Sequence, residues 1–250
     1  MASPQQPRVL IAFEQRARRR SYSGGVDQLT YAYGRVAAWL GRSAPVTAAT
    51  LRPAASDGYV QSVLSRVRRH APGEVVSFWR CHDGVDSENP SAFVLPGGYR
   101  PLRLDEVVKL SGSLEGRWIP VAARSADALL LVDCEPGPTS GHLVVQDQRD
   151  MPVVEDLTLT DLLGRVAGAL RASTAWRGWA VGVVEGELRW IDSRPGATLS
   201  TRDAEAITTA QAEQRAQHVE VSRVGDRVAR SGGSPRIRNG SARRQAPTDT

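Results

Sequence analysis

The stretch Phe78–Gly84, FWRCHDG, decides the fold of this chain. Its aromatic and apolar residues form one side of a short helix that starts near Glu74, and this helix runs directly into an Asp-Gly turn. Gly84 has no Cβ and tolerates a positive φ, so the chain can reverse direction at once. The pattern before the turn is helical. The pattern after it is a meander of short strands, an order that carries no obvious catalytic group and favours a binding module over an enzyme.

Apolar residues with helical spacing occur on both sides of this turn. They predict a helix over Gly25–Leu40 and a second helix that Ser56 caps and that extends to Val67. The segment Ser43–Pro53 between them is rich in Ala, Thr and Pro and is expected to be a loop. Further helices are predicted over Leu104–Leu110 and after Thr158, where Asp161 stands at the capping-box position.

Short apolar segments bounded by turn residues predict the strands. They are Ser91–Leu95, Trp118–Ala122, Ala128–Asp133, His142–Gln146 and Met151–Val154, and a closing hairpin is expected between Trp179 and Trp190. Leu129–Val132 is continuously apolar, which predicts a central strand covered on both faces.

Charge divides the chain into a middle region and two basic ends. Its 250 residues carry a formal charge of +5. Residues 1–25 hold five arginines and one glutamate, and residues 223–250 hold seven arginines and two aspartates. The middle is therefore mildly acidic. We expect a basic flexible arm over 1–25, one domain over 26–192, a helix or linker over 193–224, and a disordered Arg/Gly/Ser-rich tail over 225–250.

Two cysteines, Cys81 and Cys134, do not make a disulfide framework for a domain of this size, which favours a reducing compartment. No apolar run approaches the length of a membrane span. The apolar stretch Val9–Phe13 is too short for a secretory signal and precedes the charge instead of following it. We expect a cytoplasmic protein without a membrane partner.

The order of these segments resembles the SUKH superfamily, specifically its Smi/Knr branch, over about residues 26–192. The segments that carry the resemblance are Trp39-Leu40, Leu51–Ala54, Phe78–Gly84, Gly98-Tyr99 with Leu102–Glu106, Trp118–Val121, Leu130–Asp133 and Gly141–Asp147. The resemblance implies an α+β fold in which a mixed, twisted sheet packs against helices. It also implies a role in binding, because bacterial members commonly act as immunity proteins that neutralise polymorphic toxins and fungal members act as interaction and signalling proteins.

The acidic loop after the FWRCHDG stretch is the predicted partner-binding region. Acidic residues flanked by aromatic ones are a mixture that interfaces favour, although solvated loop charge is the alternative. The expected contact residues are Trp79, His82, Asp83, Asp86, Glu88, Tyr99 and Arg100. Trp39, Trp79 and Trp118 also stand in apolar stripes that predict a core position, whereas Trp176 and Trp179 are expected to be partly exposed.

No catalytic, cofactor or metal residue is predicted. Cys81, His82, Cys134 and His142 lie in unrelated segments without the spacing of a zinc site, which favours core cysteines and a surface or capping histidine. The acidic loop lacks the order of a calcium-binding loop. Phosphate-loop, dinucleotide-binding and nucleophile-elbow motifs are missing from the sequence.

The sequence thus predicts a cytoplasmic, non-enzymatic immunity protein that binds a cognate toxin stoichiometrically. Its mildly acidic surface would favour a basic partner. One alternative stays open: a Smi/Knr-like regulatory or scaffolding protein, related to the cell wall or to signalling, whose basic ends recruit nucleic acid or another partner.

Overall fold

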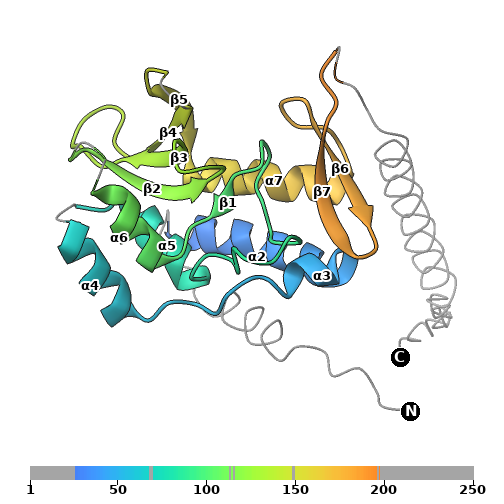
Figure 1. Ribbon diagram of the computed structural model, residues 1–250, viewed down its shortest axis with the longest axis horizontal. Coiled ribbons are helices and arrows are strands. Elements are labelled where there is room, and N and C mark those ends of the chain that lie inside the picture. The colour runs from blue at the N-terminus through green and yellow to red at the C-terminus, as the bar shows by residue number, and fades with distance from the viewer. Residues whose placement is uncertain are drawn as a thin grey trace, which may run out of the picture. The chain divides into compact units, whose positions relative to one another are not determined.

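The computed structural model describes residues 26–67, 70–112, 114, 116–147, 150–195 and 197. Helices dominate the first part and strands the second (Figure 1). The helices are α2 (Val26–Ser43), α3 (Pro45–Ala48), α4 (Asp57–Val67), α5 (Gly73–Cys81), α6 (Leu104–Ser111) and α7 (Leu159–Ala172). The strands are β1 (Arg100–Pro101), β2 (Trp118–Ala123), β3 (Ala128–Asp133), β4 (His142–Asp147), β5 (Val153–Thr158), β6 (Trp179–Val184) and β7 (Glu187–Asp192).

Two sheets are present in this part of the chain. Strands β1 to β5 form one sheet in sequence order, and β6 and β7 form a separate hairpin. All the pairs between these strands are antiparallel. Strand β3 lies in the middle of the larger sheet and all six of its residues are buried, which confirms the predicted central strand. The expected α+β class is confirmed, but the sheet is antiparallel where a mixed sheet was expected.

The predicted helices are confirmed together with the caps that start them. The amide of Tyr59 donates to the Ser56 hydroxyl at 3.3 Å at the start of α4. Thr158 and Asp161 form the expected capping box at the start of α7, with the Asp161 amide donating to the Thr158 hydroxyl at 3.2 Å. These bonds satisfy amides that have no partner within their helix. Helices α2 and α7 pack against each other across the centre of the fold (Figure 1).

The turn after α5 lies directly against the segment that leads into α6. Gly84 has φ +67°, and a Cβ built on it would lie 2.5 Å from the Arg103 nitrogen. The Trp79 indole donates to the Leu102 carbonyl at 3.3 Å, and the Leu102 amide donates to Val121 in β2 at 3.0 Å. The FWRCHDG stretch therefore joins the helices to the larger sheet.

Three sequence predictions of secondary structure are wrong in part. Pro45 starts the short helix α3 inside the segment expected to be a loop, a position where its missing N–H costs nothing. Ser91–Leu95 is not a strand; only Leu95 pairs, with Tyr99, because the chain reverses at Gly97 and Gly98. The strand expected over Met151–Val154 instead begins after Pro152, which has no N–H for a ladder, and extends to the cap of α7.

The predictions for the ends of the chain lie outside the described residues. These are the arm over 1–25 and the tail over 225–250, together with most of the helix or linker expected over 193–224. No helix in the part that the structure describes is long and apolar enough to cross a bilayer.

Replacing Gly84 with alanine should destabilise the fold strongly. The new Cβ meets backbone atoms of Leu102 and Arg103 that cannot move aside, and φ +67° is strained for alanine. We expect a loss of about 2–4 kcal/mol in the free energy of unfolding, measured by urea denaturation. Gly164→Ala, in α7 with nothing near its Cβ, is the matched control and should be neutral or stabilising by up to about 1 kcal/mol. Similar effects of the two changes would contradict the close contact.

Acidification should destabilise the fold through His82. The ring is buried between Tyr33, at 4.5 Å between centroids, and Phe78, at 4.6 Å. Burial lowers the pKa of His82 to about 3, opposed by a smaller effect of the Phe78 backbone. The unfolded chain, with an ordinary histidine pKa near 6.5, thus binds the proton first, and stability falls as the pH drops below about 6.5.

The change in the free energy of unfolding between pH 6.5 and 4.5 reports mainly on this histidine, because carboxylates titrate mainly below that window. We expect a loss of about 2–3 kcal/mol over the window in urea denaturation. His82→Leu should abolish most of the slope, whereas His70→Gln, at an exposed position, should keep it. An unchanged slope in His82→Leu would assign the pH dependence to other groups.

Candidate functional site

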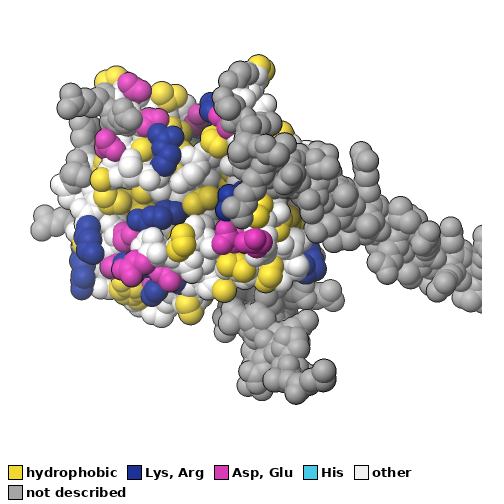
Figure 2. Space-filling view, turned by 45° about the vertical axis from the view of Figure 1, so that its right-hand side comes forward, with side chains coloured by type: hydrophobic (Ala, Val, Ile, Leu, Met, Phe, Trp, Pro, Cys, Tyr) yellow, Lys and Arg dark blue, Asp and Glu magenta, His cyan; other side chains and the backbone are white. Residues whose placement is uncertain are grey.

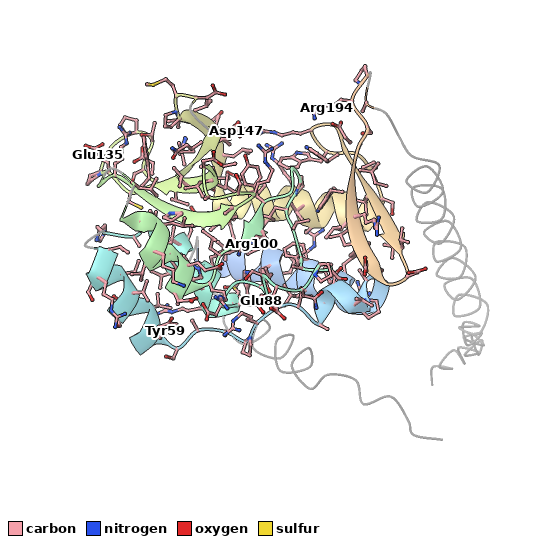
Figure 3. The ribbon with its side chains drawn as sticks, viewed as in Figure 1. Tyr59, Glu88, Arg100, Glu135, Asp147 and Arg194 are labelled. Atoms are coloured by element: carbon pink, nitrogen blue, oxygen red, sulfur yellow. The ribbon has the colours of Figure 1, made fainter. Side chains whose placement is uncertain are left out.

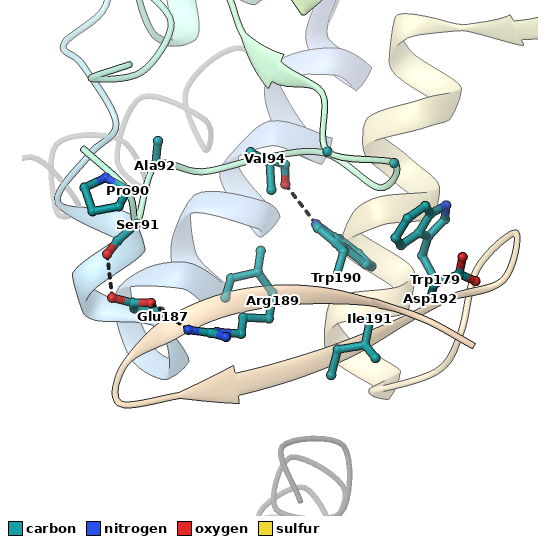
Figure 4. A pocket seen from close by; sticks show the side chains of 13 residues that line it. Pro90, Ser91, Ala92, Val94, Trp179, Glu187, Arg189, Trp190, Ile191 and Asp192 are labelled. Carbon is teal, nitrogen blue, oxygen red and sulfur yellow. Dashed lines mark hydrogen bonds and ion pairs between the residues drawn. The ribbon is translucent and has the colours of Figure 1, made fainter. Parts of the chain in front are cut away.

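A groove of about 500 Å³ lies between the loop before β1 and the β6–β7 hairpin (Figure 4). Its walls are the loop residues Pro90, Ser91, Ala92, Val94, Gly97 and Gly98 and the hairpin residues Trp179, Glu187, Leu188, Arg189, Trp190, Ile191 and Asp192. Two hydrogen bonds connect the walls. The Trp190 indole donates to the Val94 carbonyl at 2.8 Å, and the Ser91 hydroxyl donates to a Glu187 carboxylate oxygen.

Helix α3 and the turn that follows it hold both walls through two buried threonines, Thr47 in the helix and Thr50 in the turn. The Thr47 hydroxyl accepts a hydrogen bond from the Leu188 amide of the hairpin at 2.9 Å. The Thr50 hydroxyl accepts one from the Phe93 amide of the loop at 3.0 Å and donates to the Thr47 carbonyl at 2.7 Å. Buried polar groups are costly unless they are paired, so these bonds hold the walls at a set separation.

The chemistry of the groove is aromatic and acidic. The side chains of Trp179 and Trp190 line it, together with the carboxylates of Glu187 and Asp192. Arg189 lies beside Glu187, with 3.6 Å between the charged groups. Figure 2 shows one face of the molecule, on which acidic side chains lie beside hydrophobic ones and beside Lys and Arg. Tryptophan in a desolvated pocket is typical of residues that dominate binding energy at protein interfaces.

One end of the groove is closed by an ion pair at the base of the hairpin. The guanidinium of Arg194 bonds both carboxylate oxygens of Asp192 and lies 5.5 Å from the centre of the Trp179 ring. The hydrogen bonds from Arg194 lower the pKa of Asp192 to about 2, so this carboxylate stays ionised at neutral pH.

Two of the predicted contact residues are buried and belong to the core. Trp79 is 0% exposed and His82 is 1% exposed. Neither can touch a partner in the folded state, so their assignment to the binding surface is corrected. The helix that carries them faces the core with this side, which agrees with the alternative placement of Trp79 in a core stripe. His82 is a capping residue of α5, as expected, but it is buried and not at the surface.

Asp83 has a structural task. Its carboxylate accepts a hydrogen bond from the Leu104 amide at 2.9 Å, at the first residue of α6, and lies 3.8 Å from the Arg52 guanidinium. The side chain is 15% exposed. Asp83 thus acts as a cap for α6 from a distant part of the sequence.

Asp86 and Glu88 are exposed on the loop that leads into the groove. Their loop continues through Pro90 and Ser91, which are the first lining residues, and Ser91 is bonded to Glu187 on the opposite wall. The acidic loop and the groove are therefore neighbouring parts of one surface. Of the predicted residues, these two have the exposure and the position that a docking role requires.

Tyr99 and Arg100 are half-buried beside a smaller cavity of about 310 Å³. The guanidinium of Arg124 lies 5.6 Å from the centre of the Tyr99 ring and bonds Asp147 at 2.7 Å. Arg100, near the middle of the view in Figure 3, makes two hydrogen bonds to Glu106, at 3.0 and 2.8 Å. The remaining bases of the cavity, Arg103 and Lys109, lie within ion-pair distance of Asp105. Its positive charges are balanced internally, so the cavity does not favour an anionic ligand.

Both cysteines are buried. Burial raises the pKa of the Cys81 thiol to about 12, which keeps it protonated. In the described ranges, no group of three or more His, Cys, Asp or Glu side chains is placed to hold a metal ion.

The threonines that build the groove were missed by the sequence analysis. Thr47 and Thr50 lie in the segment expected to be a loop, and the signal that was available is Pro45, a preferred first residue of a helix. Trp190 was recognised only as a hairpin residue. Its partner Val94 is 96 residues away in sequence, and no local sequence pattern predicts such a contact. Trp176 and Trp179 are partly exposed, as expected. Trp39 and Trp118, which were expected in the core, are only partly buried and pack against it.

In comparisons with known proteins, no family model matches the chain and no curated protein is significantly similar to it. The Smi/Knr resemblance therefore rests on the order of its segments and stays a prediction.

Asp83 and Asp86 should differ sharply in their effect on stability. Asp83→Ala removes the acceptor of the Leu104 amide and should lower the free energy of unfolding by about 1–3 kcal/mol. Asp86→Ala changes an exposed loop residue and should stay within about 0.5 kcal/mol of the wild type. Urea denaturation at neutral pH measures both. Equal losses would show that the acidic loop acts as one structural unit and would remove Asp86 from the candidate surface.

Proposed function

We propose that this protein is a non-enzymatic protein-binding module of the Smi/Knr type, and that it acts in the cytoplasm as a bacterial immunity protein that neutralises a toxin by stoichiometric binding. The observation that carries the proposal is the groove with two tryptophans in its wall beside an exposed acidic loop. The resemblance of the segment order to the SUKH superfamily supports the choice of immunity protein among binding modules.

The groove suits binding because it is built before a partner arrives. The hairpin wall is bonded to Thr47 in α3 and the loop wall to Thr50 in the turn after α3, and the indole of Trp190 is bonded to the Val94 carbonyl. A partner therefore does not have to order these side chains, and the entropy cost of association is reduced. Tight complexes at small interfaces depend on such preorganised aromatic residues more than on buried area.

The charges around the groove favour a basic partner. Asp86 and Glu88 lie on the adjoining loop and are exposed, whereas the groove carboxylates of Glu187 and Asp192 are paired with Arg189 and Arg194. The charge that a partner meets therefore comes from the loop. Complementary charge raises the rate of association and excludes acidic competitors, while its effect on affinity is smaller. A basic toxin, such as a nuclease that binds a polyanion, would match this surface.

The test is capture of the partner by the full-length tagged chain from its native cell, followed by identification and reconstitution of the pair. We expect a complex of fixed stoichiometry in sedimentation analysis, and we expect co-expression to suppress the partner's toxicity. Asp86→Lys with Glu88→Lys should slow association by about tenfold at low salt and less at high salt, because screening weakens exposed charge.

Asp127→Lys with Glu135→Lys is the control, since it makes the same charge change at exposed positions outside the loop and groove. It should slow association much less. An equal effect of both pairs would remove the acidic loop from the interface. A captured protein whose toxicity is unaffected would reject the immunity role. Recovery of nucleic acid, lost when residues 1–25 and 223–250 are deleted, would favour the regulatory alternative.

A further inference from the structure

The end of the groove holds an arginine side chain in a slot made by three residues. Arg194 lies over the Trp179 ring, with 5.5 Å from the guanidinium carbon to the ring centre. Its Nε donates to one oxygen of Asp192 at 2.9 Å and its Nη2 donates to the other. The third residue is Gly178, where a Cβ would lie 2.2 Å from the Arg194 side chain, so the slot exists only because position 178 has no side chain.

These are the contacts by which proteins recognise arginine in general. A carboxylate that takes two parallel N–H bonds fixes the plane of a guanidinium, and an aromatic face adds a cation–π contact. Lysine, with a compact ammonium, cannot make the same pair of bonds. Trp179 and Asp192 also line the groove, where Figure 4 shows them side by side at one end.

The arginine now in the slot is a replaceable occupant. Arg194 is only two residues from Asp192, and its side chain is 60% exposed. Exposed ion pairs of this kind contribute little to stability. A guanidinium from another protein can take the same two acceptors and the same ring face while Arg194 swings into solvent.

We infer that the Trp179–Asp192 slot is a binding site for an arginine side chain of the partner protein, which displaces Arg194 when it docks. This inference rests on the proposed function, since it names the chemistry that the partner presents to the groove. Asp86 and Glu88, exposed on the loop that leads into the groove, extend acidic character along the same surface and favour an arginine set within a basic segment.

The inference predicts opposite effects for two residues that touch each other. The probe is a synthetic nonapeptide with three arginines among Gly and Ser, compared with peptides in which lysine or citrulline replaces each arginine. Binding to the full chain is followed through the indole NMR signals at low salt. The arginine peptide should bind wild type at least threefold more tightly than the lysine peptide and should move the Trp179 signal.

Arg194→Ala empties the slot and should tighten binding of the arginine peptide at least threefold. Adding Asp192→Asn to Arg194→Ala should then weaken binding at least tenfold relative to Arg194→Ala alone, and adding Trp179→Leu should weaken it as well. Arg189→Ala also removes one positive charge, from the wall of the groove and outside the slot, and should change binding less than twofold.

If Arg194→Ala tightens binding of the arginine peptide no more than Arg189→Ala does, the effect is one of net charge and the inference is overturned. Equal binding of the lysine peptide would overturn it too, and so would binding of arginine amide as tight as that of the peptide, because the ligand would then be a small molecule. Different outcomes would reject the slot and the proposed function. A captured toxin complex insensitive to Trp179→Leu and Asp192→Asn rejects only the slot, whereas peptide binding with no protein partner rejects only the function.

Discussion

The close approach of Gly84 to the backbone of Leu102 and Arg103 is the contact on which the rest of this fold depends. On one side, the Leu102 carbonyl accepts a hydrogen bond from the Trp79 indole, and the Asp83 carboxylate accepts one from the Leu104 amide of the same segment. On the other side, the Leu102 amide is bonded to Val121 in β2. A single short segment therefore ties the end of α5 to the start of α6 and to the sheet. This segment can lie against position 84 only because the residue there has no Cβ, which would otherwise overlap the backbone of Leu102 and Arg103.

The groove depends on a second set of long-range bonds, which start from α3 and the turn after it. Thr47 is bonded to the hairpin and Thr50 to the loop, and the two threonines are bonded to each other. Because both walls are bonded to this one short segment, movement of one wall would leave buried amides without partners. This constraint gives the surface that we propose for docking a shape that is independent of any ligand, while the exposed loop beside it remains free to carry charge.

Charge is distributed so that the basic residues of the described part are mostly paired. Arg100 with Glu106, Arg124 with Asp147, and Arg194 with Asp192 are ion pairs with two hydrogen bonds each. Around the groove, Asp86 and Glu88 stay exposed. The acidic character of the candidate surface thus comes from where carboxylates are left accessible, and the total charge of the chain, which its ends dominate, is a poor guide to it.

The sequence by itself determined the features that depend on near neighbours. Helical stripes, the caps at Ser56 and Thr158, the buried central strand and the turn at Gly84 all follow from residues within a few positions of one another, so their patterns are visible in the chain. The apolar stripe already favoured a core position for Trp79, but the tertiary structure alone decided that His82 is buried, that Asp83 caps a helix 21 residues away, and that Thr47 meets Leu188 across 141 residues. Such contacts depend on which surfaces meet after the elements pack. Local periodicity does not specify which surfaces meet, because the same side chain can occupy an exposed or a buried position depending on which segment packs against it.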